Sequence, residues 1–138
     1  MAKKVYVTRR ATFSASHRLY NPALSEAENE ALYDKCSNPN GHGHNYTLEV
    51  TVEGTPGKDS GYVIDLKELK RIIHQELLVK VDHKHLNLDV PFLKDIIPTA
   101  ENLVVAFWNV LAPCIKKGSL SRLKLHETEN NVVEYCGE

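Results

Sequence analysis

The segment His42-Gly43-His44 is the sharpest chemical feature of this sequence. In an extended strand, residues i and i+2 project from the same face, so two imidazoles with this spacing can converge on one metal ion. The intervening glycine allows a backbone or a ligand to approach closely. Short histidine pairs also arise by chance, so the interpretation depends on whether a further ligand lies nearby.

His17 can supply that further ligand, because it ends an alternating segment and an antiparallel neighbour would bring it alongside the pair. Three neutral imidazoles are typical of a catalytic zinc site, which keeps one position open for water or substrate. A rival pair, His83 and His85, follows a helical pattern, and residues two apart in a helix are rotated by roughly 200°. The sequence therefore favours Zn²⁺ at His17, His42 and His44.

Cys36 lies six residues before His42. It could be a fourth metal ligand, or a thiolate whose pKa a nearby metal or cation lowers, which would make it a usable base. Asp82-His83 is a carboxylate–imidazole pair of the kind that orients another acid–base group. The alternative is an ordinary helix end followed by a favourable histidine.

Two acids remain as candidates for binding a substrate. Glu127 falls at the end of a predicted strand, and Glu101 in the first turn of a predicted helix, where an acid is favoured on electrostatic grounds alone. A buried carboxylate can accept two N–H bonds from the planar edge of a guanidine-type heterocycle. A solvated surface acid explains either residue taken alone.

The elements that must position these groups follow from periodicity. Alternation of apolar and polar residues predicts a first strand over 4–17 and a second over 45–54. The Asn-, Pro- and Gly-rich run between Cys36 and Gly43 reads as a loop. A third, short strand (YVIDL, 62–66) could form a hairpin with the second, and two more strands are expected over 120–128 and 132–136.

Three helices are expected. A capping-box pattern opens a short one at 25–34. Asp65 can cap a long helix that ends near Val81, and Thr99 can cap another that includes Leu111. Runs of strands with segregated helices indicate an antiparallel α+β domain, one small sheet covered on one face by two helices. We expect a single domain over 1–138.

Composition excludes several classes. Lys and Arg (17) nearly balance Asp and Glu (18), whereas a nucleic-acid binder normally has a strong basic excess. No apolar run approaches the roughly 20 residues that span a bilayer. The N-terminus has charges on both sides of a short apolar stretch, unlike a signal peptide. Three cysteines, an odd count, argue against a disulfide framework, so we expect a cytoplasmic protein.

Taken together, five motifs resemble the 6-pyruvoyl tetrahydropterin synthase family over nearly the whole chain. They occur in order as FSASHRLY (13–20), CSNPNGHGHNY (36–46), VDHKHLNLD (81–89), PTAEN (98–102) and HETEN (126–130). The resemblance implies the tunnelling fold, with a four-stranded antiparallel sheet and two helices per subunit. Sheets close into a barrel in each trimer, and two trimers stack into a homohexamer.

The resemblance also implies an activity, the conversion of 7,8-dihydroneopterin triphosphate to 6-pyruvoyl tetrahydropterin with loss of triphosphate, in tetrahydrobiopterin biosynthesis. It implies one zinc ion per subunit on His17, His42 and His44, with Mg²⁺ possible beside the triphosphate. Cys36 would be the base and Asp82 and His83 would assist it. Glu127 would anchor the pterin, and Thr99 and Glu101 would line its pocket. The long spacing from Cys36 to His42 resembles that of this family more than that of the related 6-carboxytetrahydropterin synthases. Arg9, Arg10 and Arg18 are candidates for binding the triphosphate.

Overall fold

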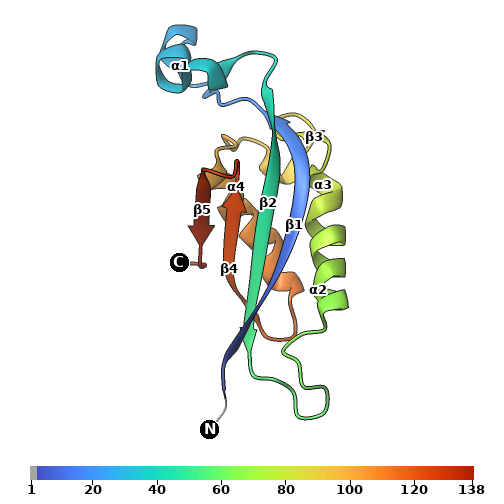
Figure 1. Ribbon diagram of the computed structural model, residues 1–138. Coiled ribbons are helices and arrows are strands. Elements are labelled where there is room, and N and C mark those ends of the chain that lie inside the picture. The colour runs from blue at the N-terminus through green and yellow to red at the C-terminus, as the bar shows by residue number, and fades with distance from the viewer. Residues whose placement is uncertain (1–2) are drawn as a thin grey trace.

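The computed structural model describes residues 3–138, and a five-stranded sheet dominates it (Figure 1). The long strands β1 (Val5–His17) and β2 (His42–Gly54) pair antiparallel over their whole length. β4 (Ser119–His126) pairs with the other edge of β2, and β5 (Val132–Tyr135) pairs with β4. β3 (Lys84–His85) runs parallel to the end of β1. The order β3-β1-β2-β4-β5 confirms the α+β class but corrects the predicted four-stranded antiparallel sheet.

The predicted third strand at 62–66 was wrong. β2 is already paired with β1 on one edge and β4 on the other, so it has no free edge for a hairpin partner. Val63 and Ile64 instead form a bend whose side chains are buried in the core. β2 also begins at His42, earlier than predicted, because the ladder with β1 continues to the end of that strand.

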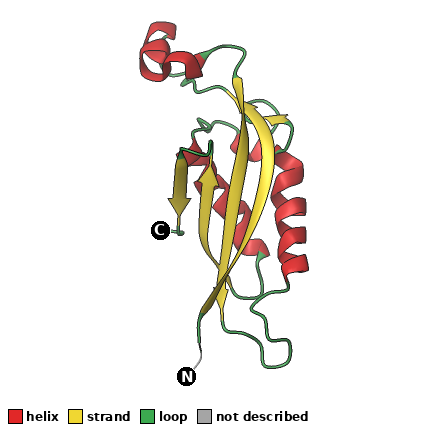
Figure 2. Ribbon diagram, in the orientation of Figure 1, coloured by secondary structure: helices red, strands yellow, loops and turns green. Residues whose placement is uncertain are grey.

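Two helical segments cover one face of the sheet (Figure 2). The first is α2 (Leu66–Ile73), a π-helical turn (His74–Leu78) and α3 (Val79–Val81) in succession, and the second is α4 (Ala100–Leu111). Both predicted caps are present. The Asp65 side chain accepts from the Lys67 N–H at 2.9 Å, and the Thr99 side chain accepts from the Asn102 N–H at 3.2 Å. Short 3₁₀ turns follow at Pro91–Leu93 and Ala112–Cys114.

The segment between β1 and β2 (residues 18–41), which we call the excursion, forms a small substructure at one end of the sheet (Figure 1). It contains α1 (Glu26–Tyr33), which opens with the predicted capping box of Ser25 and Glu28, and a 3₁₀ turn at Asp34–Ser37. Asn29 is only 1% exposed and exchanges hydrogen bonds with the backbone of Asn21 at 2.7 and 3.0 Å. This buried, satisfied amide holds the excursion together internally.

Buried and polar side chains alternate along the strands, as the sequence predicts. The helix-facing side chains of β2 are fully buried, whereas the opposite face presents mostly hydroxyl and charged side chains. Across that polar face Glu49 of β2 meets His126 of β4, with 2.6 Å between Oε2 and Nε2. Among residues 3–138, no helix is long and apolar enough to cross a membrane. The core-facing residues of β2 are Tyr46, Leu48, Val50 and Val52.

Candidate metal centre and active site

Three histidines converge at the end of the β1–β2 ladder. His17 and His42 are direct partners in the last pair of that ladder, and His44 lies two residues along β2 on the same face. One ligand atom from each ring lies within 4.8 Å of the other two. The two Nε2 atoms of His17 and His42 are 3.1 Å apart, near the roughly 3.3 Å expected for two nitrogens on a tetrahedral zinc ion. The structure thus brings together the three residues that the sequence selected.

The start of α4 fixes the orientation of His17. Its Nδ1 lies 2.8 Å from the carbonyl oxygen of Pro98, the residue before the Thr99 cap. Donation from Nδ1–H to that carbonyl leaves the lone pair of Nε2 directed at the other two rings, an arrangement that recurs in metal-binding histidines. Tyr46, fully buried, places its hydroxyl 3.4 Å from the same Nδ1. Sequence reasoning missed Pro98 and Tyr46, although the parity of Tyr46 with His44 placed it on the correct face.

Burial favours the neutral form of two of the three imidazoles, His17 and His44. Burial, and to a smaller extent the neighbouring His42 and His44, lower the pKa of His17 to about 4. Burial also lowers the pKa of His44, an effect that the charge of Glu127 opposes. The Nε2 atom of His44 is buried and has no hydrogen-bond partner among the described residues. A buried, unpartnered nitrogen beside the ring nitrogens of His17 and His42 fits a metal ion.

Glu127 lies beside this cluster. Its Oε2 is 3.9 Å from the Nε2 of His17, and its side chain is 23% exposed. It continues the parity of Leu123 and Leu125, the core-facing residues of β4, so it projects from the same face as the three histidines. The sequence-predicted carboxylate therefore lies beside the cluster, next to His17.

Asp82 and His83 form a second group at the outer edge of β1. The Asp82 Oδ1 accepts from the Ser14 N–H at 2.9 Å and lies 3.0 Å from the His83 Nδ1. The Ser14 N–H is the main cause of a lowered Asp82 pKa. His83 has φ 60°, an uncommon left-handed conformation for histidine, and its side chain is 83% exposed. Asp82 thus holds an outward-facing imidazole in place.

Cys36 stands apart from this pair. It is half-buried in the 3₁₀ turn after α1, and its carbonyl accepts from the Leu19 N–H at 2.8 Å. Among residues 3–138 no hydrogen bond joins it to Asp82 or His83. The rival histidines do not converge either. His83 points outward, and the Nδ1 of His85 accepts from the Asn87 N–H at 3.2 Å.

The remaining predicted residues are scattered. Thr99 caps α4 next to the Pro98 carbonyl, while Glu101 is exposed in the first turn of α4. Arg9 and Arg10 lie roughly 25 Å along β1 from His17 and line a separate cavity with Lys70 and His74. The structure therefore does not bring these two arginines to the histidine cluster.

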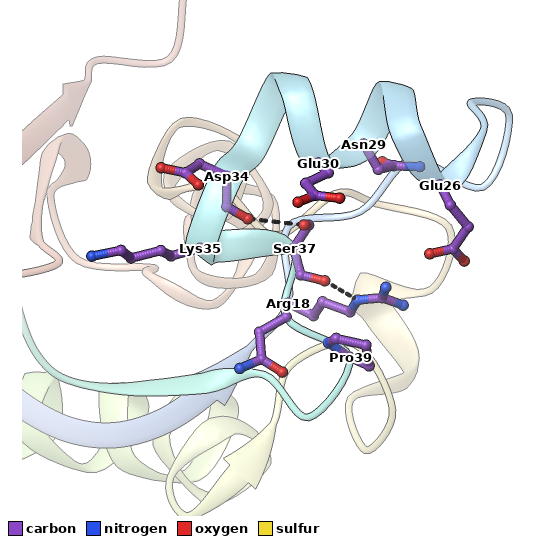
Figure 3. A pocket seen from close by; sticks show the side chains of 9 residues that line it. Arg18, Glu26, Asn29, Glu30, Asp34, Lys35, Ser37 and Pro39 are labelled. Carbon is purple, nitrogen blue, oxygen red and sulfur yellow. Dashed lines mark hydrogen bonds between the residues drawn. The ribbon is translucent and has the colours of Figure 1, made fainter.

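Arg18 turns into the excursion instead. Its Nε donates to the Ser37 carbonyl at 2.8 Å, and its guanidinium carbon lies 3.9 Å from the ring centre of Tyr20. Figure 3 shows it beneath α1 at a cavity of about 500 Å³ that Glu26 and Glu30 also line. A cavity with these acids is a poor place for a triphosphate.

Comparison with known proteins decides the family. The family model described as 6-pyruvoyl tetrahydropterin synthase matches residues 6–138. This chain belongs to that family. The Dictyostelium discoideum 6-pyruvoyl tetrahydrobiopterin synthase is 47% identical over 138 residues, 100% of both chains. The Homo sapiens protein of the same name is 46% identical over 132 residues, covering 96% of this chain and 91% of the human one.

A solved structure agrees with the family's fold. The Caenorhabditis elegans 6-pyruvoyl tetrahydropterin synthase superposes with a TM-score of 0.94 at 37% identity, covering 99% of this chain and 98% of that one. At this TM-score, the arrangement of strands and helices described above follows the fold of that family member.

Gly41 allows the close approach of the two histidine strands. It has φ +73°, and a Cβ there would lie 2.9 Å from the His17 carbonyl oxygen and 3.1 Å from the His85 Nε2. Gly41→Ala should therefore destabilise the metal-free protein by about 1–2 kcal/mol or more and weaken zinc binding, because the His17 backbone must shift. Urea unfolding and zinc titration measure both effects.

Gly61→Ala is the matched control, since Gly61 has φ +80° with nothing within 4 Å of its added Cβ. It should show the backbone strain without any loss of zinc affinity. Equal zinc affinities for the Gly41 and Gly61 variants would contradict the steric argument.

The lowered pKa of His17 predicts acid sensitivity of the metal-free protein. Between pH 6.5, the ordinary histidine value, and about pH 4, the unfolded chain binds a proton at His17 that the folded chain rejects. Stability must then fall as the pH falls, by about 2 kcal/mol between pH 7.5 and 5 from this residue. Urea midpoints at the two pH values measure it, and His17→Asn should flatten the slope. An unchanged slope in that variant would assign the sensitivity elsewhere.

Proposed function

We propose that this chain converts 7,8-dihydroneopterin triphosphate to 6-pyruvoyl tetrahydropterin with zinc held by His17, His42 and His44. The observation with the most weight is the convergence of three buried or half-buried imidazoles in a chain of this family. A zinc ion at this position would act as a Lewis acid toward the substrate side chain. Eliminating triphosphate and rearranging the side chain needs no external oxidant, so no nicotinamide or flavin enters the proposal.

The chain's own groups have separate tasks in this proposal. Cys36 moves protons between the pterin side chain and ring, and Asp82 orients His83 as its partner. Glu127 accepts N–H bonds from the guanidine-type edge of the pterin. Thr99 and Glu101, at the start of α4, line the pocket beside it.

A site made from more than one subunit would explain why Cys36 and the Asp82–His83 pair do not meet within the chain. Two features support assembly. Within the described chain no strand pairs with the outer edge of β1 from Val5 to Ser14, and β5 likewise has a neighbour on one edge only. Open edges of this length invite strand pairing with another chain. We propose a homohexamer of two trimers whose sheets close into barrels, located in the cytoplasm.

The deciding experiment is incubation of the zinc-loaded protein with 7,8-dihydroneopterin triphosphate and Mg²⁺, followed by triphosphate assay and identification of the pterin. The expected product is 6-pyruvoyl tetrahydropterin. A carboxylated pterin with acetaldehyde would move the chain to the 6-carboxytetrahydropterin branch. Release of phosphates without a change in the pterin side chain would indicate a zinc hydrolase. A fold that collapses when zinc is removed would indicate a structural site.

A further inference from the structure

The carboxylate of Glu127 is held against the histidine cluster by its local backbone. Its N–H donates to the Asn131 carbonyl at 3.0 Å, which closes the turn between β4 and β5. The Thr128 hydroxyl accepts from the N–H groups of Asn130 and Asn131 at 3.2 and 3.1 Å and fixes the same turn. Because the turn is fixed, Glu127 remains beside His17 even without a bound ligand.

A negative charge on Glu127 needs a cation or hydrogen-bond donors to compensate it. A largely buried carboxylate is costly unless a cation or several donors compensate it. Among the ion pairs of residues 3–138, its one partner is the Nε2 of His17 at 3.9 Å, a distance too long for a hydrogen bond. No lysine or arginine within ion-pair distance neutralises Glu127 in the described chain. A dication between the three imidazoles would supply the missing positive charge.

We propose that Glu127 is the fourth ligand of the metal when no pterin is bound, and that pterin binding takes this carboxylate off the metal. The proposal rests on the proposed function for the metal and for the pterin. Three histidines and one carboxylate complete a tetrahedral set from ligand types that zinc accepts. The Glu127 carboxylate cannot direct both of its oxygens at the metal and at the pterin edge at the same time. Binding of the pterin therefore takes the carboxylate off the metal. Glu127 would thereby link substrate entry to the opening of a metal coordination position.

Metal binding without any pterin provides the test. Glu127→Gln keeps the shape of the side chain and removes its charge, and we expect zinc affinity, measured by chelator competition, to fall by about 10–100-fold. The matched control is Glu129→Gln, which makes the same change two residues away on the exposed side of the turn and should leave zinc affinity unchanged. Circular dichroism of both metal-free variants checks that the fold is retained.

Cobalt substitution distinguishes ligation from a remote charge effect. The visible spectrum of the Co²⁺-loaded protein should change in Glu127→Gln and remain the same in Glu129→Gln, because it reports the ligand set. Adding 7,8-dihydroneopterin should change the spectrum of the parent protein and remove most of its difference from Glu127→Gln. An unchanged cobalt spectrum in Glu127→Gln, with or without a loss of zinc affinity, would overturn direct ligation. None of these measurements depends on turnover, so a failure of the proposed function would be seen separately.

Discussion

Cys36→Ala should reduce turnover of dihydroneopterin triphosphate by about 10²–10⁴-fold, the usual contribution of a general acid–base group. The substitution removes the thiol but keeps the main-chain bond from the Leu19 N–H to the carbonyl of residue 36, so the excursion retains its shape. Zinc binding should persist, because the three histidines converge without the sulfur. The measurements are kcat, KM and the zinc content of the purified variant.

Cys114→Ala is the control for this experiment. Its thiol donates to the Val110 carbonyl at 3.4 Å at the end of α4, on a different element from the excursion. This variant should turn over substrate like the parent protein. If Cys36→Ala kept full activity with zinc bound, Cys36 would not be the base. If that variant lost its zinc, the thiol would be a metal ligand, the alternative that its spacing left open.

His44→Ala should reduce turnover at least as much as Cys36→Ala, because it should remove the metal. Losing one of three imidazoles should remove zinc at working concentrations, and Lewis-acid stabilisation of several kcal/mol corresponds to roughly 10³-fold or more in rate. His44 is a cleaner target than His17, which bonds to Pro98 and is buried in the structure. Because the His44 Nε2 has no hydrogen-bond partner in the described chain, its removal leaves no protein group newly unpaired.

The stability of the metal-free His44→Ala protein should therefore stay within about 1 kcal/mol of the parent. His74→Ala, which changes an exposed histidine on the π-helical turn, should retain both zinc and activity. Zinc assay by atomic absorption and steady-state rates compare the variants. A His44→Ala protein that kept stoichiometric zinc and normal turnover would contradict the proposed metal site.

Local sequence pattern was enough to group the three histidines that converge in the structure. The i, i+2 spacing of His42 and His44 and the place of His17 at the end of the first strand were enough to group them, although the second strand was expected to begin only at 45. The parity of Glu127 with Leu123 and Leu125 is a further signal that could have placed it on the same face. Capping residues predicted the starts of α1, α2 and α4 because each cap satisfies backbone N–H groups within three residues.

What the sequence could not give depends on contacts between distant segments. The segment at 62–66 has the composition of a strand, yet both edges of β2 are occupied by β1 and β4. The two-residue strand β3 exists only because it reaches Ala15 and Ser16 of β1. Pro98 has no side-chain signal for its contact with His17, because its carbonyl makes the bond. Arg9 and Arg10 show that nearness in sequence to His17 is not nearness in space along an extended strand.

Because His17 pairs with His42, the excursion is separated from the β1–β2 ladder, and the two can change independently. The excursion between them leaves and returns at one point of the ladder, and its own contacts, such as that of buried Asn29, hold it together. Doubling the length of such a loop costs only about 0.6 kcal/mol in closure entropy. Insertions or deletions there should therefore move the Cys36 thiol relative to the three histidines without disturbing their convergence. Exchange of this loop between relatives should thus change the surroundings of the histidine cluster while the cluster itself stays in place.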